Sequence, residues 1–114
     1  MNKRRIGTFY EEAAIEYLRS RGVQIVDRNV TCGSLGEIDI IGIEKDCLLF
    51  IECKYRSGNS KGSSLDAVGR GKQKTIRRCA EYYLFAHGEY SKLYIRFDVI
   101  GIDGDSIEWI KNAF

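Results

Sequence analysis

The sequence lacks any long apolar run. No stretch approaches the roughly 20 consecutive apolar residues that a membrane-spanning helix requires, and the opening MNKRRIGTFYEE has no apolar core of the kind found in secretory signals. These two absences exclude a membrane-anchored class of protein. We therefore expect a cytoplasmic protein with no membrane partner.

Cysteine and histidine are too few and too scattered to indicate a zinc site. The four cysteines show no C-x-x-C spacing, and His87 is the one histidine. A structural zinc ion needs four such ligands at short spacing. Cys53 and Cys79 fall at apolar positions, where a small buried thiol is favoured over a disulfide, although disulfides stay open in principle. Reduced cysteines also agree with the cytoplasm.

Length and composition indicate one globular domain. The chain has 114 residues, of which 44% are hydrophobic and 30% charged. This is long enough to bury a single core and too short for two, and the composition is not that of a disordered chain. We expect one domain spanning residues 1–114.

Charge is distributed unevenly along the chain. The formal net charge is only +2, but residues 54–78 contain eight basic residues and one acid, so this segment carries +7 and the remainder −5. Such polarity suits a polyanion that binds one face. A solvated loop and helix face would give the same pattern, so charge alone does not decide between them.

Hydrophobic periodicity predicts alternating helices and strands. The predicted strand over residues 47–55 is apolar on both faces. This indicates a sheet covered on both sides by helices, an α/β arrangement. The predicted elements are helices over 8–21 and 72–86, strands over 23–29, 37–43 and 47–55, a mobile loop over 57–71 with one helical turn near Leu65, and a closing hairpin that turns at Asp103 and Gly104.

A hairpin between residues 37 and 55 places two acids together. If Lys45 and Asp46 form a two-residue turn, then facing residues have numbers that sum to 91, and Asp39 faces Glu52. Directly opposed side chains have Cβ atoms about 4.5 to 5.5 Å apart. Lys54, two residues beyond Glu52, lies on the same face.

Two carboxylates beside a lysine suit metal-dependent hydrolysis of a phosphodiester. Mg²⁺ binds one or two carboxylates together with water and substrate phosphate, and Asp39 and Glu52 would be these ligands, with the backbone carbonyl of Cys53 as a further one. Lys54 would position the attacking water or stabilise charge in the transition state. The alternative for Glu52 and Lys54 is a structural ion pair at the end of the strand.

Two further acids have competing interpretations. Thr8 followed by Glu11 fits a capping box at the start of a helix, yet Glu11 also heads the buried stripe of that helix and would point toward the sheet. Both roles stay open. Asp98 is interpreted as a strand acid paired with a neighbouring arginine and is left out of the catalytic set.

The ordered series of motifs resembles a known family over nearly the whole chain from Gly7. It resembles the YraN-like uncharacterised family of bacterial proteins, which is similar to Holliday-junction resolvases and belongs to the restriction-endonuclease-like PD-(D/E)xK superfamily. The motifs are GTFYEEAA, GEIDII, LLFIECKYR, GKQKTIRRCAEYYL, IRFDVI and IEWIKNAF. The chain departs from the superfamily pattern at Ile38, where proline usually precedes the acid, and at Cys53, where valine is usual.

The resemblance implies a restriction-endonuclease-like α/β/α core, with a mixed central sheet, that cuts DNA with Mg²⁺ or Mn²⁺. It also raises branched or distorted DNA as the substrate and, by analogy with junction resolvases, a homodimer. A DNA-binding protein that keeps this fold without cleaving is the alternative. The resemblance and the basic segment together give the catalytic set Glu11, Asp39, Glu52 and Lys54, the G-E-I-D acids Glu37 and Asp39, and the nucleic-acid-binding set Arg56, Arg70, Lys72, Gln73, Lys74 and Arg77.

Overall fold

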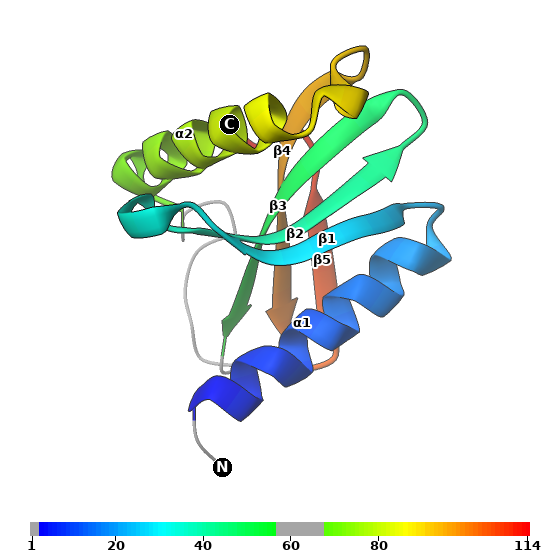
Figure 1. Ribbon diagram of the computed structural model, residues 1–114. Helices are drawn as coiled ribbons and strands as arrows, with labels where there is room; N and C mark the ends of the chain where they lie inside the picture. The colour runs from blue at the N-terminus through cyan, green and yellow to red at the C-terminus, as the bar shows by residue number, and fades with distance from the viewer. Residues whose placement is uncertain (1–2, 57–67) are drawn as a thin grey trace.

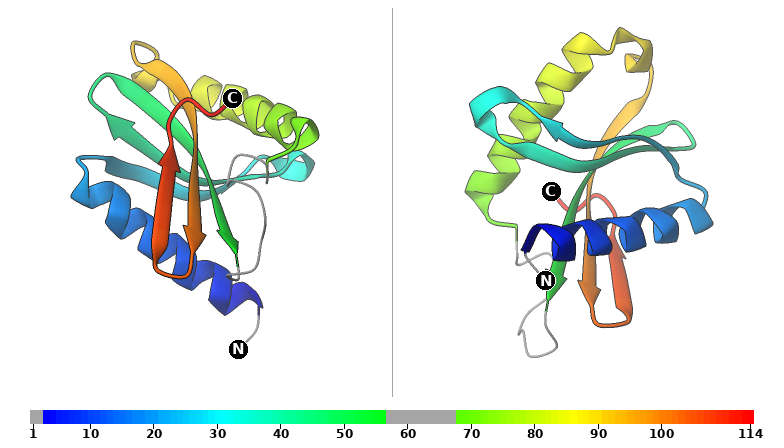
Figure 2. Two further views of the ribbon diagram at one scale, coloured as in Figure 1. Left: turned by 180° about the vertical axis from the view of Figure 1, so that it is seen from behind. Right: turned by 60° about the horizontal axis from the view of Figure 1, so that its bottom comes forward.

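The computed structural model describes the backbone of residues 3–56 and 68–114 and the side chains of residues 8–55 and 68–114. One mixed five-stranded sheet has a helix on each face, α1 on one side and α2 on the other (Figures 1 and 2). This confirms the predicted α/β class. The elements are α1 (Lys3–Ser20), β1 (Gln24–Thr31), η1 (Gly33–Leu35), β2 (Glu37–Glu44), β3 (Cys47–Arg56), α2 (Arg70–Ala86), η3 (Gly88–Tyr90), β4 (Tyr94–Asp103) and β5 (Ser106–Ile110).

The strands lie in chain order, and one pairing is parallel. The β3–β4 pair is parallel, while β1–β2, β2–β3 and β4–β5 are antiparallel. A parallel pair needs a long crossover connection, and α2 lies within it. The crossover places α2 on one face of the sheet, where Lys72 of its first turn contacts Glu52 of β3.

The β2–β3 hairpin has the predicted register. Its turn is Lys45 and Asp46, with Lys45 at a φ of 56°. The paired residues run from Glu44↔Cys47 to Ile40↔Ile51, and every pair sums to 91. Asp39 and Glu52 come directly after the last of these pairs, and the charge of Glu52 acts on Asp39.

Each helix buries one apolar stripe against one face of the sheet. Leu48 and Phe50 of β3 pack in the cluster that contains the α2 residues Ile76, Cys79, Ala80 and Tyr83. Leu49 and Ile51 pack in the other cluster, with Ala14, Ile15 and Leu18 of α1. The alternation predicted for β3 is therefore confirmed, and full burial of each of these aliphatic and aromatic side chains stabilises the fold by roughly 1.5 to 3 kcal/mol.

Three predicted boundaries are wrong. The first helix begins at Lys3, so Thr8 lies inside it and Thr8 and Glu11 do not form a capping box. No residue between Lys3 and Thr8 stops the helix, since Gly7 costs only about 1 kcal/mol in a helix interior. The second helix begins at Arg70, two residues early. The last hairpin turns at Gly104 and Asp105, because Gly104 adopts the positive φ of 58° and Asp103 still pairs with Ser106.

Cys79 is not a free thiol. It forms a disulfide with Cys32, at a Cα–Cα distance of 5.5 Å, and so ties the end of β1 to α2. The preference for a buried thiol at this position was wrong because the partner lies 47 residues away in the sequence, where no local pattern indicates it. Cys47 and Cys53 are free.

The predicted loop over 57–71 falls largely outside the described residues, and so does the helical turn near Leu65. Among the helices that the structure does describe, none has the length and apolar character needed to cross a membrane.

Candidate metal centre

Asp39 is fixed at the point where the β2–β3 ladder ends. The last paired residues are Ile40 and Ile51. Beyond them, Asp39 Oδ2 accepts a hydrogen bond of 2.9 Å from the backbone N–H of Cys53, so a carboxylate takes the place of a backbone acceptor. Burial, followed by the nearby charge of Glu52, raises the pKa of Asp39 to about 7, against the opposing effect of the Cys53 hydrogen bond. The carboxylate is therefore held rigidly in a place that disfavours its charge.

Three acids converge beside this point. Ligand oxygens of Glu11 from α1 and of Glu37 and Asp39 from β2 all lie within 4.8 Å of one another. Burial raises the pKa of Glu11, and Glu37 contributes to the same effect. Three carboxylates at this separation repel one another unless a proton or a cation lies between them. An all-oxygen donor set is also the set that Mg²⁺ and Mn²⁺ prefer, so these residues fit such an ion.

The basic groups of the site gather on Glu52. This side chain is only 4% exposed. Its Oε1 lies 2.5 Å from Lys72 Nζ and 3.6 Å from Lys54 Nζ. A buried carboxylate without such partners would be costly, and the two ammonium groups offset that cost. The ion pair considered for Glu52 and Lys54 is therefore present, although Lys72 makes the shorter contact.

The two lysines have opposite pKa shifts. Burial lowers the pKa of Lys54, and the adjacent Lys72 adds to this effect. For Lys72, burial acts in the same direction, but the combined effects of Glu52, Lys54 and Asp39 outweigh it and raise the pKa. One amine is thus held firmly as a cation, while the other releases its proton more readily than an ordinary lysine.

The structure brings together the four residues predicted to be catalytic. Asp39 interacts electrostatically with both Glu52 and Glu11, and Lys54 contacts Glu52. Glu37 was quoted in a motif but was not predicted as a ligand, although its spacing of two from Asp39 on one strand already indicated a shared face. The Cys53 thiol packs on the α1 side, and burial raises its pKa to about 12. Its backbone carbonyl stays a prediction as a ligand.

The residues predicted to bind nucleic acid have different surroundings. Arg70 and Lys74 are exposed on α2. Gln73 Nε2 donates to the Val68 carbonyl at 2.9 Å and so holds the start of that helix. The Arg77 guanidinium lies 4.7 Å from the centre of the Phe97 ring. Lys72 contacts Glu52 instead of facing away from it, and the side chain of Arg56 lies outside the described residues.

Asp98 has the structural role predicted for it. It is fully buried and accepts hydrogen bonds from Arg96 Nε and Nη2, Trp109 Nε1 and the backbone N–H of Asn112, each at 2.9 Å. Every polar atom of this carboxylate is therefore satisfied within the fold. Asp98 ties β4 to the residues that follow β5.

Fold and site together define a small α/β domain with a carboxylate cluster and two lysines at one end of its sheet. The chain belongs to the uncharacterised protein family UPF0102, whose profile matches residues 10–102. This confirms the YraN-like family membership predicted from the motifs. The matched range includes every residue of the carboxylate and lysine cluster.

Relatives align along almost their full length. A UPF0102 protein of Marinobacter nauticus is 40% identical over 115 residues, covering 96% of this chain and 92% of the relative. A UPF0102 protein of Clostridium botulinum is 41% identical, with coverage of 96% and 93%. One of Legionella pneumophila is 41% identical over 110 residues, with coverage of 95% and 92%. These names state family membership only.

Proposed function

We propose that this protein is a metal-dependent endonuclease that hydrolyses DNA phosphodiester bonds. The observation that carries the proposal is the gathering of Glu11, Glu37 and Asp39 within 4.8 Å of one another, where the charges of Glu52 and Lys72 also act on Asp39. Burial and repulsion there raise the pKa of Asp39 to about 7. A fold stabilised only by its core gains nothing from such a cluster.

Asp39, Glu37 and Glu11 would hold the divalent ion, with Glu52 alongside as predicted from the sequence. A bound Mg²⁺ or Mn²⁺ would neutralise phosphate oxygens and lower the pKa of a coordinated water. The backbone bond from Cys53 fixes the orientation of Asp39. Such rigid placement of charge is what hydrolysis of a phosphodiester requires of the protein.

The two lysines have distinct roles in this proposal. Lys72, a cation at the first turn of α2, binds a nonbridging phosphate oxygen. Lys54 is more buried, and its lowered pKa suits it to hold the attacking water at Nζ and to exchange a proton. Both amines are held close to Glu52 by ion pairs.

A DNA-binding protein that does not cleave is the second candidate. The contact of 2.5 Å between Lys72 and Glu52 favours it, because a carboxylate neutralised within the fold has less need of a metal ion. Against it, a cluster of acids repels phosphate, so a pure binder gains nothing from Asp39 and Glu37 beside the basic start of α2. The acids favour catalysis.

Labelled four-way junction, flap and duplex DNA test the proposal. We expect cleavage with Mg²⁺ or Mn²⁺ and none with EDTA. Asp39→Asn and Glu52→Gln should each reduce cleavage by at least about 100-fold, as expected for loss of a group that stabilises the transition state, with DNA binding equal or tighter. Glu108→Gln, an exposed acid on β5, is the matched control and should cleave normally.

Two outcomes would decide against the proposal. Binding without cleavage under every divalent metal would support the non-cleaving alternative. Cleavage that persists in Asp39→Asn would place the reaction at another point of the chain.

A further inference from the structure

The outer face of α2 exposes two aromatic side chains that the core does not use. Tyr82 is 64% exposed and Phe85 is 93% exposed. They lie beyond the basic start of the helix, on the side that faces away from the sheet. An aromatic pair this exposed costs solvation free energy unless a partner covers it.

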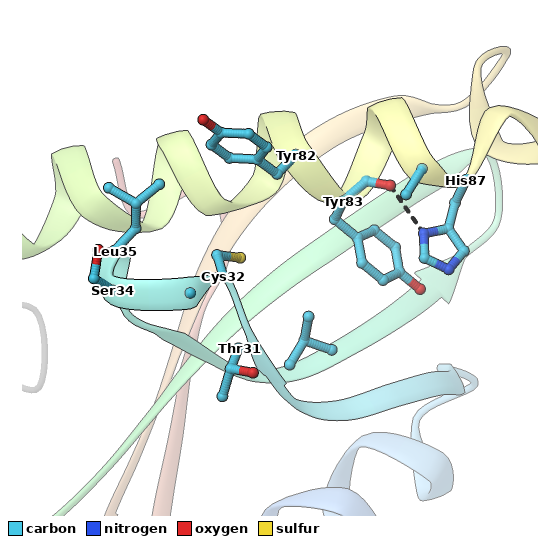
Figure 3. A pocket seen from close by; sticks show the side chains of 10 residues that line it. Thr31, Cys32, Ser34, Leu35, Tyr82, Tyr83 and His87 are labelled. Atoms are coloured by element: carbon cyan, nitrogen blue, oxygen red, sulfur yellow. Dashed lines mark hydrogen bonds between the residues drawn. The ribbon is translucent and has the colours of Figure 1, made fainter.

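Two hollows border Tyr82. The first, of about 640 Å³, lies between α2 and the segment from the end of β1 through η1, and Figure 3 shows Tyr82 on one side of it and the stacked rings of Tyr83 and His87 on the other. The second, of about 590 Å³, is lined by Leu35, Arg78, Glu81, Tyr82 and Phe85. Leu35 and Tyr82 belong to both, so the ring of Tyr82 forms a partition between two recesses large enough for flat ligands.

Basic side chains continue this surface along α2 toward the start of the helix. Lys74, Arg78 and Tyr82 follow one another at intervals of four residues and so form one stripe on the helix. Lys74 and Arg78 are exposed, and neither makes a salt bridge with another residue that the structure describes. Uncompensated cations beside exposed rings suit a ligand that has both anionic groups and flat aromatic groups.

We propose that this stripe binds an unpaired segment of the DNA strand that occupies the metal centre, an inference that rests on the proposed function. Lys74 and Arg78 bind successive phosphates, while unstacked bases stack on Tyr82 and Phe85. Every base has a π-face, so such stacking tolerates any sequence. Glu81, the one acid that lines the second hollow, is placed to accept a hydrogen bond from the amino group of a base.

The distance along the helix agrees with a short single-stranded arm. Lys72 contacts the metal centre, and the ten residues from there to Tyr82 span about 15 Å at the helical rise of 1.5 Å per residue. Duplex DNA rises about 3.4 Å per nucleotide and an unstacked strand extends further, so this span corresponds to at most about four nucleotides. The substrate class is therefore DNA with unpaired nucleotides within a few positions of the scissile bond, such as a flap or a frayed junction.

Fluorescence anisotropy of a labelled 12-nucleotide oligothymidine, measured in EDTA, tests the proposal without cleavage. Tyr82→Ala should weaken binding by roughly 5- to 150-fold, the factor that one base–aromatic stack contributes, and Tyr82→Trp should restore it. Arg78→Gln should reduce the salt-dependence slope by about 0.7, because one phosphate contact is lost. Tyr94→Ala is the matched control, since Tyr94 is 69% exposed on β4, and its affinity should equal that of the wild type.

Equal affinity of Tyr82→Ala and Tyr94→Ala would overturn the proposal even if the protein cleaves DNA. The opposite result is that Tyr82→Ala loses oligonucleotide binding although the wild type cuts no substrate. This would support the binding surface and reject the proposed nuclease activity. Competition by free thymidine monophosphate at the concentration of the oligonucleotide would assign the hollows to free nucleotides. A dimer in sedimentation that Phe85→Ser dissociates, with oligonucleotide binding unchanged, would assign the surface to a second copy of the chain.

Discussion

Asp39→Asn should stabilise the metal-free protein at alkaline pH while it abolishes cleavage. The pKa of Asp39 in the folded state is about 7, raised from the ordinary aspartate value of 3.8 mainly by burial and then by the charge of Glu52. Between these two values the folded state binds more protons than the unfolded state, so stability falls as pH rises through this window. Above pH 7 the full cost of the buried charge is present.

The size of this cost follows from the shift. At 1.36 kcal/mol per pKa unit, ionisation of Asp39 lowers the free energy of unfolding by up to about 4 kcal/mol. Asparagine keeps an oxygen that accepts the hydrogen bond from the Cys53 N–H, so the substitution removes the charge and preserves the contact. We expect Asp39→Asn to be more stable than the wild type by up to about 4 kcal/mol at pH 8, with the difference disappearing near pH 4.

Urea denaturation followed by far-ultraviolet circular dichroism, from pH 4 to pH 8 in EDTA, measures this difference. Asp105→Asn, in the exposed β4–β5 turn, controls for a general change in net charge and should show no such pH dependence. Mn²⁺ should then stabilise the wild type and not Asp39→Asn, because only the former holds the ion. A stability difference that is independent of pH, or a variant less stable than the wild type at pH 8, would refute the claim that burial raises the pKa of Asp39.

Three further changes test the fold by the same denaturation assay. Asp98→Ala should destabilise the protein by about 3 to 5 kcal/mol, since it removes one of the two carboxylates that pair with Arg96 and leaves Trp109 Nε1 and the Asn112 N–H without this acceptor, and a loss under 1 kcal/mol would contradict the role described for this carboxylate. Reduction of the Cys32–Cys79 disulfide, with a sequence separation of 47, should cost about 4 kcal/mol by the loop-entropy relation, and mass spectrometry after alkylation without reductant should find two blocked cysteines. Gly42→Ala places a Cβ 2.7 Å from Val23 Cγ1 and should cost about 1 to 3 kcal/mol by overpacking, and an unchanged free energy of unfolding would contradict this.

The hairpin that carries most of the site could be predicted because its signals are local. Alternating apolar residues set the faces of β2 and β3, and a two-residue turn at Lys45 and Asp46 set their register. The register was therefore predicted correctly as far as Ile40 and Ile51, the residues next to Asp39 and Glu52. The capping pattern at Thr8 was misleading, because a residue pattern typical of a helix start does not prevent the helix from beginning further upstream, here at Lys3.

The missing parts of the site depend on contacts distant in sequence. Lys72 was predicted to face DNA, yet it reaches Glu52 because the crossover brings the start of α2 over the end of β3. The pairing of Cys32 with Cys79 depends on the same placement of α2. No periodicity in a single strand or helix contains this information, since both contacts are set by how the two faces of the sheet are covered.

The positive charges in the site are distributed unevenly among its acids. Two lysines neutralise Glu52, whereas Arg28, at 4.0 Å from Glu11, is the nearest cation that the described residues offer to the cluster of Glu11, Glu37 and Asp39. If the acids were only structural, the same lysines would lower the total cost more by sharing their charge among all four. The arrangement instead leaves the cluster of three acids short of positive charge, and it places Lys72, a cation on a long side chain, within electrostatic range of Asp39. A divalent cation at the cluster would remove that deficit, and a phosphate would then be the group that draws Lys72 from Glu52.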